Sequence, residues 1–168
     1  MAPVAPPDFY LTSKYAAELL LRSYGSMLRT IAFRFFFVYG PGQTRMLVPS
    51  LVGKVLRDEP IEIEGHPGLR INPIYVEDAV RAFAPALTLD ESGVFNVAGD
   101  DVVTVSEIVE LIAEAVSRPA QVRHRPRGDD GDLVADVTRM RRVLGVAPAI
   151  GLAEGLGRVV SSLGARSR

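Results

Sequence analysis

The 168-residue chain has no cysteine, no tryptophan and only two histidines. The lack of cysteine excludes disulfide bridges, thiolate zinc sites and a cysteine nucleophile, and with two histidines we predict no metal site. Acidic and basic residues nearly balance at a net charge of −1, so neither nucleic acid nor an anionic membrane is expected as a partner. No apolar run is as long as a membrane span, and the N-terminal MAPVAPP lacks the apolar core of a signal peptide. These absences predict a soluble cytoplasmic protein.

Apolar residues make up 48% of the chain and charged residues 23%, which is ordinary for a globular protein. Short apolar runs alternate with amphipathic stretches, and this alternation predicts an α/β fold. The helix-like segments are 10–26, 46–58, 77–89, 104–116, 138–144 and 152–163. The strand-like segments are 31–38, 61–68 (a short strand and a turn), 71–76, 94–99 and 121–126, with the third expected to break at Pro73 because proline cannot donate to a ladder.

Tyr10 and Lys14 are four residues apart on the first predicted helix, so their side chains share one face. Lysine is rare here, since Lys14 and Lys54 are the only two against 17 arginines. A free tyrosine, with a pKa near 10, is a poor base at neutral pH, but a neighbouring ammonium favours the phenolate. The pair could therefore move a proton on and off a substrate hydroxyl while hydride passes to a nicotinamide. The spacing alone favours an exposed helix start without a catalytic role.

Five segments, in order, resemble the extended short-chain dehydrogenase/reductases, the NAD-dependent epimerases and dehydratases of sugar nucleotides. The resemblance runs from about residue 5 to about residue 160. The segments are the Tyr-x-x-x-Lys helix with Ser13 and Glu18, RFFFVYGPGQ (34–43), a glycine turn with Arg70 followed by IYVEDAV (74–80), FNVAGDDVVTVSEIVELI (95–112) and RPRGDDGDLVADVTRMRRVLGVAP (125–148). Five ordered matches are far more specific than any one of them.

The resemblance implies a role for each matching position. Tyr10 is expected to transfer the proton, and Lys14 to stabilise the phenolate and bind the ribose of NAD or NADP. The backbone near Phe36 is expected beside the nicotinamide. Phe37 stands where the family often has an asparagine that touches the substrate, and a phenyl ring cannot donate in its place.

The resemblance also implies a nucleotide-sugar substrate whose diphosphate is bound by arginines. Arg70 is one candidate ligand, because a guanidinium pairs bidentately with phosphate. The second is Arg125 or Arg127, since the family pattern predicts one arginine before Pro-Gly-Asp and this chain offers two. Asp78 and Asp136 are expected to cap helices or hold loops. Both histidines are expected to be bystanders.

The expected fold is the C-terminal portion of a Rossmann-type doubly wound domain with a small substrate-binding α/β region. No G-x-x-G-x-x-G occurs in the chain, so we expect it to lack the dinucleotide-binding half that precedes the Tyr-x-x-x-Lys helix in this family. Residues 1–168 then form a single incomplete domain. Residues 1–45 supply the catalytic helix and the following strand, and residues 46–168 mostly the substrate-binding region.

Three functions stay open. The first is the C-terminal part of an NAD(P)-dependent epimerase or dehydratase of a nucleotide-activated sugar, inactive without its glycine-rich half. The second is a catalytically inactive truncated chain or a binding and assembly module. The third is a related oxidoreductase of a non-sugar substrate, which Phe37 keeps open. Because the strand at 31–38 would present an apolar edge, we expect a homo-oligomer or a complementing N-terminal half as partner.

Overall fold

One helix in the described part of the chain begins with a complete side-chain cap. The computed structural model describes residues 9–128 and 131–166. Helix α5 (Val105–Val116) starts with a capping box, in which Thr104 Oγ1 accepts from the Glu107 amide and the Glu107 carboxylate accepts from the Thr104 amide. The other helices are α1 (Phe9–Ser23), α2 (Leu47–Leu56), α3 (Val76–Arg81), α4 (Phe83–Leu87), α6 (Thr138–Leu144) and α7 (Leu152–Arg166). Within the described residues, no helix combines the length and the hydropathy needed to cross a membrane.

The strands pair two by two, and three of the four pairs are parallel. These parallel pairs are β1 (Ile31–Phe35) with β6 (Gly93–Val97), β2 (Val38–Tyr39) with β5 (Ile74–Tyr75), and β3 (Ile61–Glu64) with β8 (Val122–Arg125). The antiparallel pair joins β4 (Arg70–Ile71) to β7 (Val103–Thr104). Parallel strands joined through helices confirm the predicted α/β class.

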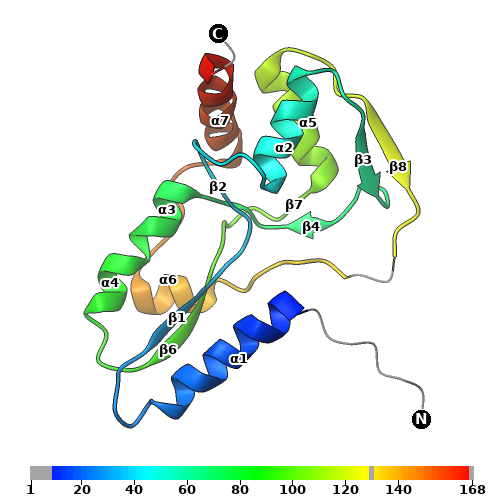
Figure 1. Cartoon of the computed structure of the whole chain (residues 1–168). Coiled ribbons are helices and arrows are strands. Elements are labelled where there is room, and N and C mark those ends of the chain that lie inside the picture. Colours follow the sequence, from blue (N-terminus) through cyan, green and yellow to red (C-terminus); the bar gives the residue numbers. More distant parts are fainter. Residues whose placement is uncertain (1–8, 129–130, 167–168) are drawn as a thin grey trace, which may run out of the picture.

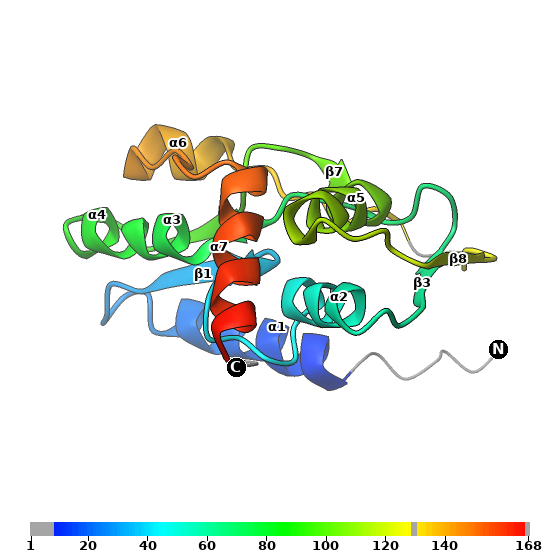
Figure 2. The same cartoon turned by 90° about the horizontal axis from the view of Figure 1, so that it is seen from above.

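Two hydrophobic clusters hold these elements together. One lies between β6 and the helices α3, α4 and α6, with Phe95, Val97 and Met140 fully buried. The other joins α2, α5 and α7 to β3, and Figure 1 shows these three helices gathered above the β1–β6 pair. In Figure 2, α1 lies on one side of β1, while α3, α4 and α6 lie on the other. Helix α1 therefore covers the face of the sheet that neither cluster occupies.

The strand predicted at 31–38 is broken in two, and this part of the prediction is wrong. β1 ends at Phe35 and β2 begins at Val38, because Phe37 adopts a left-handed backbone with φ of 45°. An extended strand cannot pass through that conformation. The apolar run that predicted one long strand carries no signal for such a turn.

Proline positions account for two other breaks. The strand expected at 71–76 divides at Pro73 into β4 and β5, as predicted. The helix expected at 77–89 divides at Ala82 into α3 and α4, with Pro85 inside α4, where it has no amide hydrogen to give to the preceding turn. The two-residue strand β7 was not predicted, because its pairing with β4 comes from a distant part of the chain.

Candidate active site

Tyr10 and Lys14 lie together on the exposed face of α1, as their spacing predicts. The Lys14 ammonium nitrogen is 5.2 Å from the centroid of the Tyr10 ring, a cation–π distance. Tyr10 is 63% exposed, so its hydroxyl is open to a ligand from outside the chain. The Ser13 hydroxyl donates to the Tyr10 carbonyl at 2.7 Å, which uses the serine locally within the first turns of the helix.

One turn further along α1, Glu18 makes a bidentate ion pair with Arg34 of β1. Arg34 Nε donates to Glu18 Oε1 at 2.7 Å, and Arg34 Nη2 donates to Oε2 at 2.6 Å. The hydrogen bond from Arg34 holds the pKa of the Glu18 carboxyl below its usual value, although partial burial opposes the shift. The sequence marks Glu18 and Arg34 only as positions within two matching segments. Nothing in their spacing indicates that their side chains form an ion pair.

Phe36 and Phe37 lie where the strand breaks. The Phe36 amide donates to the Val97 carbonyl at 3.0 Å, which ties this segment to the end of β6. Phe37 is half-buried and packs against the cluster of α2, α5 and α7. A left-handed backbone costs an ordinary side chain about 1–2 kcal/mol, so the surrounding packing holds Phe37 in a strained conformation. Strained residues of this kind often occur at functional sites.

Arg70 and Arg127 converge on one carboxylate, that of Asp132. Arg127 Nη2 donates to Asp132 Oδ1 at 2.9 Å, and the Arg70 amide donates to the same oxygen at 3.3 Å. The Arg70 side-chain nitrogen Nη1 lies 4.0 Å from Asp132 Oδ2. The hydrogen bond from Arg127, followed by that from the Arg70 amide, lowers the pKa of Asp132. The structure therefore brings Arg70 and Arg127 together through a residue that sequence reasoning missed.

Arg125 is not part of this group. It lies on β8 and forms an ion pair with Glu62 of the neighbouring strand β3. Arg127 lies two residues beyond the end of β8 and pairs with Asp132 instead, so the two candidate arginines have different partners. The sequence left the choice between them open, and no spacing signal could have separated them.

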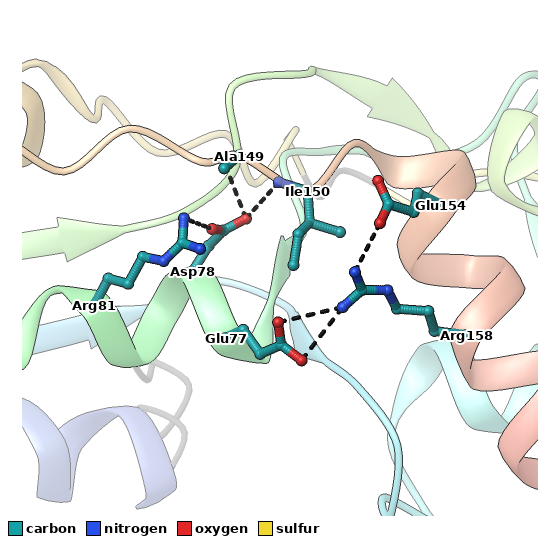
Figure 3. Close-up of polar contacts among 7 residues, drawn as sticks. All are labelled: Glu77, Asp78, Arg81, Ala149, Ile150, Glu154 and Arg158. Atoms are coloured by element: carbon teal, nitrogen blue, oxygen red, sulfur yellow. Dashed lines mark hydrogen bonds and ion pairs between the residues drawn. The ribbon is translucent and has the colours of Figure 1, made fainter.

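Asp78 has the structural role predicted for it. Its side chain is fully buried, and Oδ2 accepts hydrogen bonds from the amides of Ala149 and Ile150, while Oδ1 accepts from Arg81 (Figure 3). The carboxylate thereby holds the segment before α7 against α3. Asp136 similarly accepts from the Thr138 amide at the start of α6.

The two histidines lie together, and His124 is next to Arg125 on β8. The His66 and His124 rings stack with centroids 4.5 Å apart, and His124 Nδ1 is 2.7 Å from the Gly65 carbonyl. Over residues 9–128 and 131–166, histidine and carboxylate side chains form no cluster of three or more that could hold a metal ion.

Two surface pockets accompany this arrangement, and neither includes Tyr10 or Lys14. One, of about 260 Å³, is lined by Tyr39, Tyr75, Asp101 and the segment 148–152, among others. The other, of about 300 Å³, lies between α1 and the first residues of β1 and β6. The Tyr10–Lys14 pair is exposed and lies outside these two pockets.

Comparison with known proteins identifies the lineage of this arrangement. The model of the NAD dependent epimerase/dehydratase family matches residues 1–98. The dTDP-4-dehydro-6-deoxy-D-allose reductase of Streptomyces bikiniensis is 32% identical over 149 residues, which are 83% of this chain and 45% of that protein.

Solved structures show the same relationship. UDP-glucose 4-epimerase of Thermotoga maritima with UDP-glucose superposes with a TM-score of 0.82 at 25% identity, covering 94% of this chain and 53% of that one. MoeE5 in complex with UDP-glucuronic acid and NAD superposes with a TM-score of 0.81 at 32% identity, covering 94% and 55%. The chain thus spans about half the length of the relatives that it matches. It belongs to the NAD dependent epimerase/dehydratase family.

Proposed function

We propose that this chain supplies the proton-transfer and substrate-binding part of an NAD-dependent enzyme that acts on a nucleotide-activated sugar. The observation that carries the proposal is the Tyr10–Lys14 pair, which stands on one exposed face of α1 with the ammonium 5.2 Å from the phenol ring. Membership of the family and the NAD and UDP-sugar ligands of the solved relatives support it. Epimerisation, dehydration and reduction are all compatible with this pair.

The chemistry follows from the two side chains. Tyr10, as phenolate, takes the proton from a substrate hydroxyl as the C–H bond on the same carbon gives up hydride, and returns it in the reverse step. The Lys14 ammonium stabilises the phenolate and can donate to ribose hydroxyls. A bound nicotinamide supplies the hydride acceptor.

The residues present fit one end of such a cofactor. Tyr10 and Lys14 are exposed and offer donors to a ribose. The Phe36 backbone follows directly after the last residue of β1. The chain contains no G-x-x-G-x-x-G for the pyrophosphate. We therefore propose that NAD, or NADP in its place, binds fully only when a complementing half or a second copy completes the site.

Arg70 and Arg127 are the proposed ligands of the substrate diphosphate. Asp132 holds both near one point, and two guanidinium groups match the charge and geometry of a diphosphate. Arg125 is less suited, because it pairs with Glu62 and does not share the Asp132 carboxylate with Arg70. Phe37 would add an apolar wall rather than a donor.

Calorimetry with NAD+, NADP+ and UDP-glucose tests the proposal. Replacing Arg70 or Arg127 by glutamine should weaken UDP-glucose binding by at least about tenfold, because each loses a charge-assisted hydrogen bond. Arg125→Gln is the matched control and should bind like the wild type.

Tyr10→Phe and Lys14→Met should reduce hydride transfer in a complemented or full-length form. Wild-type protein that binds none of the three ligands, alone or complemented, would refute the proposal.

A second candidate is a binding or assembly module that keeps the Tyr–Lys pair only by descent. The open surface around Tyr10, with both pockets located elsewhere, favours this candidate. It requires that Tyr10→Phe leave the biological function unchanged. It also requires that no dinucleotide bind.

A third candidate is an oxidoreductase of a non-sugar carbonyl or alcohol. Phe37 favours it, since its half-buried ring offers no hydrogen bond where a polar substrate would need one. In that case, Phe37→Asn should not improve the affinity for UDP-glucose. A clear gain in affinity would argue against this candidate.

A further inference from the structure

Helix α1 packs on the rest of the protein without burying any residue completely. None of its residues is buried, and Glu18 is the one residue of the helix that is not exposed, with its side chain 15% accessible. Apolar packing within this chain therefore constrains the rotation of the helix about its own axis only weakly, and a directional polar contact can add to that constraint.

The Glu18–Arg34 pair has the geometry for this task. Two nearly equal hydrogen bonds, of 2.7 and 2.6 Å, join both carboxylate oxygens to two guanidinium nitrogens. Such a fork fixes direction as well as distance, which a single point contact does not. Arg34 itself is held in β1, where it pairs with Asn96 of β6.

The helical spacing links this contact to the proton-transfer pair. Tyr10, Lys14 and Glu18 follow one another at intervals of four residues. With about 3.6 residues per turn, Glu18 lies about 40° from Lys14 and about 80° from Tyr10 around the axis. A rotation of α1 that broke the ion pair would turn all three side chains together. At the other end of the contact, Arg34 is two residues before Phe36.

We propose that the Glu18–Arg34 ion pair is a positioning contact that aims Tyr10 and Lys14 at the strand end formed by Phe36. This inference rests on the proposed function, because positioning has a purpose only if the pair acts on a substrate beside that strand. Glu18 and Arg34 themselves touch neither substrate nor cofactor. They act through α1, by setting where the phenol and the ammonium point.

Hydrogen exchange of the α1 amides tests the structural part on the full chain. Glu18→Gln keeps the size of the side chain but loses the charge, and it should speed exchange of residues 9–23 by about threefold to tenfold. Arg34→Lys keeps the charge but loses the bidentate geometry, so its α1 amides should exchange at rates between those of the wild type and those of Glu18→Gln. Glu59→Gln is the matched control, since Glu59 makes an equally bidentate pair with Arg57 far from α1. Unchanged exchange in Glu18→Gln would overturn the inference.

Kinetics separate positioning from a merely structural role. In the complemented or full-length form, with NAD+ and UDP-glucose as probes, Glu18→Gln should lower kcat by about tenfold or more and leave KM within about twofold. Glu59→Gln should change neither value. An active wild type with undiminished kcat in Glu18→Gln would overturn the inference and leave the proposed function standing. A wild type with no dinucleotide binding and no turnover would overturn the proposed function, and the inference with it.

Discussion

Asp78 and Ile150 lie 72 residues apart in the chain, yet the buried carboxylate of Asp78 accepts a hydrogen bond from the Ile150 amide at 2.9 Å (Figure 3). Replacing Asp78 by alanine should lower the free energy of unfolding by about 3 kcal/mol, because it leaves two amides and Arg81 without their acceptor. Urea denaturation followed by circular dichroism measures the loss. Glu77→Ala is the control, since Glu77 is exposed and pairs with Arg158 at the surface. It should cost less than about 1 kcal/mol, and equal losses would contradict the role given to Asp78.

The left-handed backbone of Phe37 makes an unusual order of stability testable. At most positions a glycine variant is less stable than the alanine variant of the same protein, but at a positive φ this order reverses. Phe37→Gly should therefore be more stable than Phe37→Ala by about 1 kcal/mol, although both lose the packing of the ring. At Phe36, where φ is not positive, glycine should be the less stable of the two. The same order at both positions would show that residue 37 is not strained in solution.

Two glycines of α7 should respond oppositely to alanine. A Cβ at Gly155 would overlap the Tyr39 hydroxyl and lie 2.9 Å from a ring carbon of Tyr75, whereas a Cβ at Gly157 would meet nothing within 4 Å. Gly155→Ala should lower the free energy of unfolding by about 1–3 kcal/mol through overpacking. Gly157→Ala should raise it by about 0.5–1 kcal/mol, since alanine is the better helix former. Thermal melts of both variants decide the matter, and a tolerated Gly155→Ala would argue against the close packing of α7 on Tyr39.

The Glu18–Arg34 pair should make stability depend on pH in a definite direction. The hydrogen bond from Arg34 lowers the pKa of the Glu18 carboxyl in the folded state. The ionised carboxylate therefore stabilises the protein at pH values above the unfolded pKa of about 4.3. That contribution is lost as the pH falls through the lower, folded-state pKa. The stability difference between wild type and Glu18→Gln should therefore be complete above about pH 5 and shrink below about pH 4. In an Arg34→Met background, the effect of Glu18→Gln on stability should depend little on pH. If the effect depended on pH as strongly as in the wild-type background, Arg34 would not be the cause of the dependence.

The free side of β1 should promote self-association. Among the described residues, β1 pairs only with β6, and Phe35 and the adjacent Phe83 are 45% and 47% exposed. An unpaired edge beside exposed aromatic rings favours a dimer or larger species. Size-exclusion chromatography with light scattering at tens of micromolar should detect it, and Phe35→Lys should reduce it. Val143→Lys, on α6, is the control. A monomeric wild type would contradict this prediction.

Much of the fold could be predicted from the sequence, because its signals are local. The capping box of α5, the break at Pro73 and the pairing of Tyr10 with Lys14 each depend on residues within a few positions of one another. Side-chain chemistry and helical geometry act over that range without help from the rest of the chain. Five motifs in order then indicated the family, which the comparisons confirm.

The tertiary structure alone decided the contacts between distant segments. It joined Arg127 rather than Arg125 to Arg70 through Asp132, and it tied Glu18 to Arg34. It also broke the apolar run at Phe37, where the packing of other elements outweighs the preference of a phenylalanine for extended backbone. The identity of the chemical groups was thus determined by the sequence. Which groups meet was determined by the folded chain, because that depends on contacts across tens of residues, which no local pattern encodes.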